Sequence, residues 1–198
     1  METVATLVLR NTEFNVEGDC IGVESGALAI LNAGYPLVYA VGDFDSVSLD
    51  DKRRILEAAH SSKVYSSQKD ESDSELAINF CLQQGYQKIY VYGALGQRVD
   101  HQHINLSLMF KHPQVILMDE TQSIQGYDEG EYELDKEKYQ KFSVFTFTNA
   151  VISLEKCVYP LQNFEINALT RLTLSNEWIE DRVKLKIHKG RVFVVKTQ

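Results

Sequence analysis

Short apolar runs recur along the first part of the chain. Five of them are almost continuous in apolar or aromatic residues, and they span positions 6–10, 20–24, 37–41, 88–92 and 114–118. Such runs are typical of strands that are covered on both faces of a sheet. Between these runs, the pattern predicts helices over 26–33, 52–60, 73–84 and 101–111. Because strands and helices alternate, we expect a largely parallel sheet with helices on its faces.

The helix predicted over 73–84 has the clearest signals at its ends. Ser72 and Glu75 have the spacing of a capping box, in which two side chains satisfy backbone N–H groups at the start of a helix. Gly85 follows the last apolar position and favours the end of the helix there.

Beyond about Thr121 the helical signal fades and short β-rich runs replace it. The segment 142–148 is rich in aromatic and β-branched residues, and apolar residues alternate with lysines over 183–187. The turn 188–191 predicts a C-terminal hairpin, and 125–140 is predicted as an exposed hairpin or loop. The sequence therefore predicts an α/β parallel-sheet domain over 1–120 and a small all-β, sandwich-like domain over 121–198.

The composition argues against several classes of protein. The 198 residues contain 20 Lys and Arg against 28 Asp and Glu, a formal charge of −8 that argues against a nucleic-acid surface. The polar N-terminus does not resemble a signal peptide, and no apolar stretch is long enough to span a bilayer. Three widely spaced cysteines among apolar residues favour buried thiols over a zinc site or disulfides. We therefore expect a cytoplasmic protein with no membrane partner.

Four loops at the expected strand ends carry carboxylates. They contain Glu24 and the segments 42–46, 69–73 and 93–100. In an open parallel sheet, ligands bind outside the carboxyl ends of the strands, so these loops should meet at one edge. So many carboxylates repel one another unless a cation lies among them, and oxygen ligands favour magnesium or calcium.

Each of these features also has a simpler explanation. Asp70 and Asp73 could stabilise a helix N-terminus through the helix dipole, and the glycines of 93–96 could serve an ordinary turn. Arg98 could form a surface ion pair with Asp100. Their joint placement at the strand ends favours a phosphate and metal site instead.

Three linked motifs carry a more specific signal. They are Gly42-Asp43-Phe44-Asp45-Ser46, Lys69-Asp70-x-x-Asp73-x-Glu75-x-Ala77 and Gly93-x-x-Gly96-x-Arg98-x-Asp100-His101-x-x-x-Asn105. In order and separation they resemble the thiamine pyrophosphokinase family. Two further elements resemble those of the family's β domain, namely Tyr159-Pro160-Leu161 and Leu174-Ser175-Asn176-Glu177. The resemblance thus covers nearly the whole chain.

The resemblance implies transfer of the terminal pyrophosphate of ATP to the hydroxyethyl oxygen of thiamine, with release of AMP. It implies that 1–120 is the catalytic, nucleotide-binding domain for ATP and Mg2+, and that 121–198 binds thiamine. Members of the family work as dimers whose acceptor site forms between protomers, which implies a homodimer here.

The resemblance also implies roles for individual residues. Mg2+ would be held by Asp43, Asp45, Asp70 and Asp73. Arg98 would clamp phosphate, while Asp100 would orient or deprotonate the attacking hydroxyl or act as a further metal ligand. The other ATP contacts would come from Ser46, Lys69, Gly93, Gly96, His101 and Asn105, and the thiamine contacts from Ser175 and Asn176.

Three positions depart from the family pattern. Gln97 and Leu174 stand where the family usually has glycine, and Glu24 stands where it commonly has aspartate. We expect these departures to affect substrate affinity more than the reaction.

Two other functions are consistent with parts of the pattern. A different magnesium-nucleotide enzyme, such as a phosphohydrolase, would keep the carboxylates but would not need the segment 174–177. A non-catalytic thiamine or nucleotide sensor would have less reason to keep so many like charges together.

Overall fold

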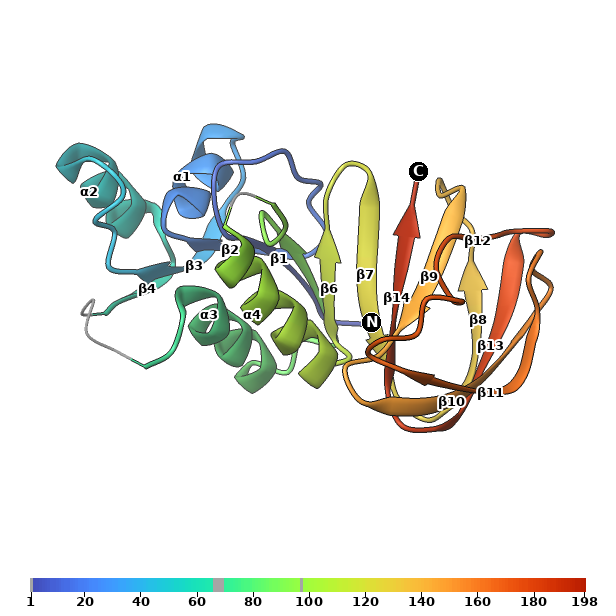
Figure 1. Ribbon diagram of the computed structural model, residues 1–198. Helices are drawn as coiled ribbons and strands as arrows, with labels where there is room; N and C mark the ends of the chain where they lie inside the picture. The colour runs from blue at the N-terminus through green and yellow to red at the C-terminus, as the bar shows by residue number, and fades with distance from the viewer. Residues whose placement is uncertain (1, 66–69, 97) are drawn as a thin grey trace. The chain divides into compact units, whose positions relative to one another are not determined.

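The computed structural model describes residues 2–65, 70–96 and 98–198. It divides the chain into two compact units, which Figure 1 shows. Unit 1 comprises Met1–Leu108 and Gln114–Glu120, and unit 2 comprises Met109–Pro113 and Thr121–Gln198. The predicted fold class is confirmed, because unit 1 is a parallel α/β layer structure and unit 2 consists of antiparallel sheets.

Unit 1 is built on parallel strands in the order β6-β5-β1-β2-β3-β4. The strands are β1 (Val4–Val8), β2 (Asp19–Val23), β3 (Leu37–Gly42), β4 (Ser61–Val64), β5 (Lys88–Tyr92) and β6 (Val115–Met118). β1 pairs with β2 on one side and with β5 on the other, so the order of the strands reverses at β1. Ligands bind at such reversal points in open α/β sheets.

Helices cover both faces of the parallel sheet. They are α1 (Ser25–Asn32), α2 (Leu49–Ala58), α3 (Asp73–Gln83) and α4 (Val99–Lys111). Figure 1 shows α1 and α2 on one face and α3 and α4 on the other. Neighbouring residues of β3 serve opposite faces, because Ala40 packs in a core with Ile30 and Ile55 while Tyr39 stacks on Phe80 of α3.

Both predicted ends of α3 are confirmed. The Ser72 side chain accepts a hydrogen bond of 3.2 Å from the backbone N–H of Glu75. At the other end, the Tyr86 N–H donates to the Cys81 carbonyl and Gly85, with φ at 80°, donates to the Leu82 carbonyl. This bonding pattern satisfies the last carbonyls of the helix and needs a left-handed residue, which glycine supplies.

Other boundaries of unit 1 differ from the prediction. α2 begins at Leu49 instead of residue 52, because the Ser48 side chain caps it by accepting from the Asp51 N–H. β1 ends at Val8, which leaves Arg10 in the loop beyond the strand. β4 gave no apolar signal since all of its side chains are exposed.

Unit 2 is a sandwich of two antiparallel sheets, with strand orders β12-β9-β14-β7 and β11-β10-β13-β8. Its strands are β7 (Gln122–Tyr127), β8 (Gly130–Asp135), β9 (Lys141–Phe145), β10 (Asn149–Glu155), β11 (Leu161–Asn167), β12 (Asn176–Glu177), β13 (Arg182–Lys189) and β14 (Val192–Thr197). Apolar side chains from both sheets form one core, among them Phe142, Ile152, Val183 and Val194.

The predicted C-terminal hairpin is wrong. β13 pairs with β10 and β8, whereas β14 pairs with β7 and β9, so the turn between them joins two sheets. Gly190 permits the crossing, because its φ is 85° and a Cβ there would lie 2.4 Å from the Asn149 carbonyl oxygen. The segment 125–140 likewise passes from one sheet to the other, with Leu134 buried in the core.

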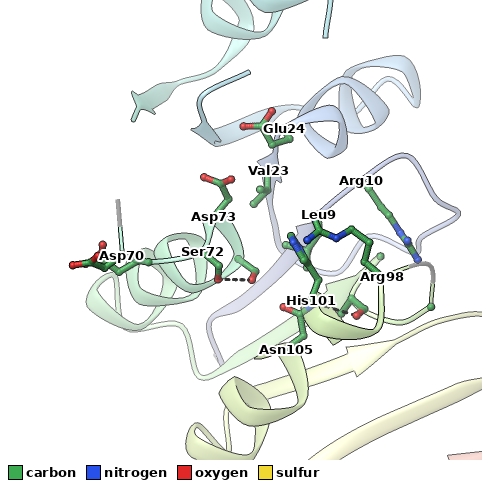
Figure 2. Close-up of a pocket in the computed structure, with 15 residues that line it drawn as sticks. Leu9, Arg10, Val23, Glu24, Asp70, Ser72, Asp73, Arg98, His101 and Asn105 are labelled. Atoms are coloured by element: carbon green, nitrogen blue, oxygen red, sulfur yellow. Dashed lines mark hydrogen bonds between the residues drawn. The ribbon is translucent and has the colours of Figure 1, made fainter. Parts of the chain in front are cut away.

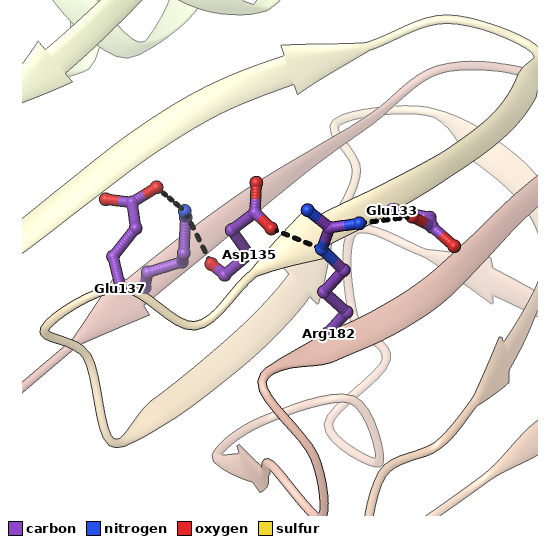
Figure 3. A network of polar contacts seen from close by, with 5 residues as sticks. Glu133, Asp135, Glu137 and Arg182 are labelled. Atoms are coloured by element: carbon purple, nitrogen blue, oxygen red, sulfur yellow. Dashed lines mark hydrogen bonds and ion pairs between the residues drawn. The ribbon is translucent and has the colours of Figure 1, made fainter.

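Charged residues connect the two sheets of unit 2 (Figure 3). Arg182 of β13 contacts Glu133 at 3.1 Å and Asp135 at 2.8 Å, both on β8. Lys196 belongs to β14 of the other sheet, and its Nζ donates to the Asp135 carbonyl at 3.0 Å and to Glu137 at 2.8 Å. The Lys196 side chain is 13% exposed, so solvent screens this ion pair less than an ordinary surface pair.

The unit 2 core can be tested separately, because it contains the chain's single tryptophan, Trp178. Ile152 is fully buried there. We expect Ile152→Ala to lower the free energy of unfolding by about 2–5 kcal/mol and Ile152→Val by about 0.5–1.5 kcal/mol, since the larger truncation leaves the larger cavity. Urea unfolding followed by Trp178 fluorescence measures both changes. Equally small losses would contradict a tightly packed core.

Candidate functional site

A cavity of about 460 Å³ opens at the carboxyl ends of the strands in unit 1 (Figure 2). Residues that follow β1, β2 and β5 line it, together with the first turns of α3 and α4. Its polar side chains are Arg10, Glu24, Asp70, Glu71, Ser72, Asp73, Ser74, Arg98, His101 and Asn105. The cavity thus lies where the strand order reverses, as expected for a ligand site in this architecture.

Three carboxylates beside the cavity are close enough to share a cation. One oxygen each of Glu24, Asp43 and Asp45 lies within 4.8 Å of the others. The strand-end pattern placed Glu24 among the carboxylates at this edge, whereas the family resemblance implied Asp43 and Asp45, but not Glu24, as metal ligands. Oxygen donors of this kind suit a hard cation such as Mg2+.

The other two predicted metal ligands lie at the start of α3. The negative charge of Asp73 helps to raise the pKa of Glu24, so Asp73 is near enough to interact with the group of three. Asp70 is exposed, and Figure 2 shows its carboxylate directed away from Glu24 and Asp73. The structure therefore gathers the four predicted carboxylates at one cavity without bringing all of them into one cluster.

Glu24 holds the loop that carries Asp43 and Asp45. Its Oε1 accepts a hydrogen bond of 2.9 Å from the Phe44 N–H, and its Oε2 accepts one of 3.0 Å from the Ser46 hydroxyl. Ser46, predicted as an ATP contact, thus uses its hydroxyl to donate a hydrogen bond to Glu24 in this structure.

Burial raises the pKa of the Glu24 carboxyl above its ordinary value. The two hydrogen bonds from Phe44 and Ser46 lower this pKa, whereas the charges of Asp43 and Asp73 raise it again. A bound cation would reverse the effect of burial and of the like charges, since it favours the ionised carboxylate.

The glycine loop after β5 is held by side chains from elsewhere in unit 1. Gly93 and Gly96 have φ values of 78° and 77°, a conformation that glycine adopts without strain. The Asn105 amide donates to the Ala94 carbonyl at 3.0 Å, and Asn105 is only 5% exposed. The Oε1 of the Gln102 side chain accepts a hydrogen bond from the Gly96 N–H at 2.9 Å. Asn105 therefore shapes this loop, although the sequence predicted it as a nucleotide contact.

Arg10 is the residue that the sequence analysis missed. It follows β1, lines the cavity and donates from its guanidinium to the Leu95 carbonyl. A Cβ at Gly93 would lie 2.7 Å from Arg10 Cγ, so the glycine makes room for the arginine. Its position just past the central strand was the signal that could have identified it.

Arg98 forms the ion pair that the simpler explanation predicted. Its Nη2 lies 2.5 Å from Asp100 Oδ2, and the two side chains are 68% and 63% exposed. The hydrogen bond from Arg98, followed by the His101 N–H, holds the pKa of Asp100 below its usual range.

The predicted acceptor residues lie in unit 2 and differ in exposure. Asn176 is 4% exposed, and its carboxamide donates to the Tyr159 carbonyl at 2.8 Å and accepts from the Tyr159 N–H at 3.1 Å. Ser175 is exposed, with φ at 56°, and its N–H donates to the Ser143 hydroxyl at 2.9 Å. Asn176 thus holds the Tyr159 segment, while the side chain of Ser175 is open to a ligand.

Two residues named in the sequence analysis, Lys69 and Gln97, lie outside the described residues. Within the described part of the chain, no helix combines the length and the apolarity needed to cross a membrane.

Comparison with known proteins gives concordant findings. Residues 15–118 match the family model described as the catalytic domain of thiamin pyrophosphokinase. The chain is 33% identical over 184 residues to the thiamine pyrophosphokinase of Bacillus subtilis, an alignment that covers 89% of this chain and 86% of the relative.

Solved structures are similar over the full length. The fold superposes on a thiamin pyrophosphokinase family protein from Enterococcus faecalis with a TM-score of 0.91 at 29% identity, covering 100% of this chain and 99% of that one. The crystal structure of Bacillus subtilis thiamine pyrophosphokinase gives a TM-score of 0.88 at 28% identity, with the same coverage.

Two side chains of the cavity should differ in what they contribute to stability. We expect Asn105→Ala to lower the free energy of unfolding by about 1–3 kcal/mol, because it leaves the buried Ala94 carbonyl without its donor. Arg98→Ala should leave it nearly unchanged, since an ion pair exposed to solvent contributes little. Chemical denaturation followed by circular dichroism compares the two variants. A large loss for Arg98→Ala would contradict the placement of this side chain at the rim.

Proposed function

The chain belongs to the thiamin pyrophosphokinase family. We propose that the cavity of unit 1 binds ATP, whose pyrophosphate the enzyme transfers to thiamine. The reaction of the family yields thiamine pyrophosphate and AMP. One observation carries the assignment of the site. The cavity at the strand reversal has carboxylates on one side and the guanidinium groups of Arg10 and Arg98 on the other, as a metal-bound polyphosphate requires.

A metal cofactor is expected for a kinase of this family, and the residues present fit one. The donors are all carboxylate oxygens, and burial together with the nearby charges of Asp43 and Asp73 raises the pKa of Glu24. We propose Mg2+ as the ion, held by Asp43 and Asp45, with Asp70 and Asp73 at the adjoining side of the cavity. When bound, it would neutralise part of the phosphate charge.

The remaining residues of the cavity would position the phosphates and the attacking hydroxyl. Arg98 would exchange its exposed carboxylate partner for phosphate, to which its fork of donors is well matched. Asp100, once released from this pair, would orient or deprotonate the thiamine hydroxyl. Arg10 and His101 line the same cavity and would contribute phosphate or nucleotide contacts. Ser46 and Asn105 would act by shaping the loops after β3 and β5.

Unit 2 would serve the acceptor. We propose that Ser175 contacts thiamine and that Asn176 fixes the segment around it through Tyr159. Large apolar side chains are exposed in this part of unit 2, among them Tyr159, Leu172, Leu174 and Ile179. Their exposure supports a homodimer that covers them and shares the acceptor site between protomers. The three buried free cysteines support a reducing, cytoplasmic location.

The reaction itself can be tested by AMP release. We expect the purified protein to release AMP from ATP and Mg2+ when thiamine is present, and to release little without it. A coupled AMP assay with and without thiamine measures this directly. Thiamine-independent phosphate release would indicate a phosphohydrolase, and thiamine binding without turnover would indicate a sensor.

The role of Arg98 can be separated from its ion pair. Arg98→Lys keeps the charge but loses the planar fork, so we expect kcat/KM to fall about 10- to 100-fold. Arg182→Lys is a matched control, because Arg182 forms exposed ion pairs in unit 2 and should leave the rate unchanged. Steady-state kinetics compares the two variants. If Arg98→Lys is as silent as the control, Arg98 is a surface ion-pair partner and has no phosphate to clamp.

A further inference from the structure

The loop 43–46 has an unusual backbone for a segment that presents two carboxylates. Phe44, inside the loop, has φ at 55°, and Gly42, the residue that precedes the loop, has φ at 150°. A non-glycine residue in the left-handed region costs free energy and persists when surrounding contacts fix it. Its side chain is one such contact, because Phe44 is 2% exposed and packs in the core between the sheet, α1 and α2.

Glu24 supplies further contacts, and they come from the neighbouring strand. It follows β2, whereas the loop follows β3, and these two strands are paired. Each carboxylate oxygen of Glu24 accepts a hydrogen bond from the loop, one from the Phe44 N–H and one from the Ser46 hydroxyl. Glu24 itself has φ at 51°, so the backbone of Glu24 is strained as well as that of Phe44.

The loop leaves room for this contact and is fastened from another side. A Cβ at Gly42 would lie 1.9 Å from Glu24 Oε1, so the approach depends on glycine at this position. On the other side, Lys52 of α2 donates from Nζ to the Asp43 carbonyl at 2.6 Å. The peptide group between Asp43 and Phe44 is therefore bonded at both of its polar atoms to side chains from outside the loop, its N–H to Glu24 and its carbonyl to Lys52.

We propose that Glu24 is a positioning residue, whose carboxylate holds the loop 43–46 so that Asp43 and Asp45 face the metal site before an ion is bound. The inference deepens the proposed function, and it rests on Asp43 and Asp45 being the metal ligands. Glu24 acts through the loop, and its two oxygens are already engaged by protein donors.

Substitution of Glu24 by glutamine distinguishes a residue that holds the loop from one that binds the metal directly. In Glu24→Gln the amide oxygen can still accept from the Phe44 N–H, and the amide nitrogen can donate to the Ser46 oxygen. This variant therefore keeps the loop contacts and loses the charge. Glu24→Ala loses both. Asp45→Asn is the matched control. The backbone N–H of residue 45 donates to Asp43 Oδ1, and this bond is kept after the substitution.

The first measurement is amide exchange of Phe44 in the metal-free protein, followed by NMR. We expect Glu24→Ala to speed exchange about tenfold or more, since a hydrogen bond to a charged acceptor is lost, and Glu24→Gln to stay within about threefold of the parent chain. Asp45→Asn should leave the exchange unchanged. Unchanged exchange in Glu24→Ala would overturn the proposal, and it would do so whether or not the proposed reaction is correct.

The second measurement is binding of Mn2+ alone, followed by loss of the free-ion EPR signal. Glu24→Ala should weaken binding because the loop is released, and Glu24→Gln should restore most of it. Asp45→Asn should weaken binding while the loop stays protected. If Glu24→Gln keeps the loop protected but binds Mn2+ as poorly as Asp45→Asn, Glu24 is a direct ligand and the positioning role is wrong. If the parent chain binds no Mn2+, the proposed metal site fails, and the exchange experiment still decides what Glu24 does.

Discussion

Repulsion between carboxylates is the constraint on which the functional part of unit 1 depends. A parallel sheet brings the carboxyl ends of its strands to one edge, and here several of the loops that follow them are acidic. The cost is visible in Glu24, whose pKa is raised by burial and by the charges of Asp43 and Asp73. The unit tolerates this cost because its strands are fixed by packing on both faces, which leaves the loops to carry the strain.

Buried and half-buried polar side chains hold the loops that carry the candidate site residues. Glu24 holds the loop after β3, Asn105 the glycine loop after β5, and Asn176 the Tyr159 segment of unit 2. In each case a side-chain amide or carboxylate replaces the backbone partner that a regular strand or helix would have supplied. The motif residues of this chain therefore divide into those whose side chains are exposed at the candidate sites and those that hold the neighbouring backbone in place.

Local patterns predicted the layers of unit 1 and both ends of α3, because capping and apolar periodicity are short-range properties. They did not predict β4, whose side chains are all exposed, or the change of sheet at Gly190, which depends on pairing between distant strands. The strand-end rule predicted ligand-binding loops at the edge of the sheet where the structure has the cavity, and it could have identified Arg10. It could not show that Asn105 binds the Ala94 carbonyl, since side-chain contacts to loop backbone depend on the tertiary fold.

Positions 24 and 42 are coupled in a way that bears on how this site can diverge. The Glu24 carboxylate occupies the space in which a Cβ of residue 42 would stand. A side chain at 42 and a fully extended glutamate at 24 therefore exclude each other. A sequence that acquires alanine at 42 must first shorten or redirect the acid at 24, whereas a shorter acid at 24 relieves this contact but leaves the preference for glycine that a φ of 150° imposes. Substitution at position 42 is thus conditional on position 24, and the order in which the two changes arise decides whether the intermediate keeps the loop 43–46 in place.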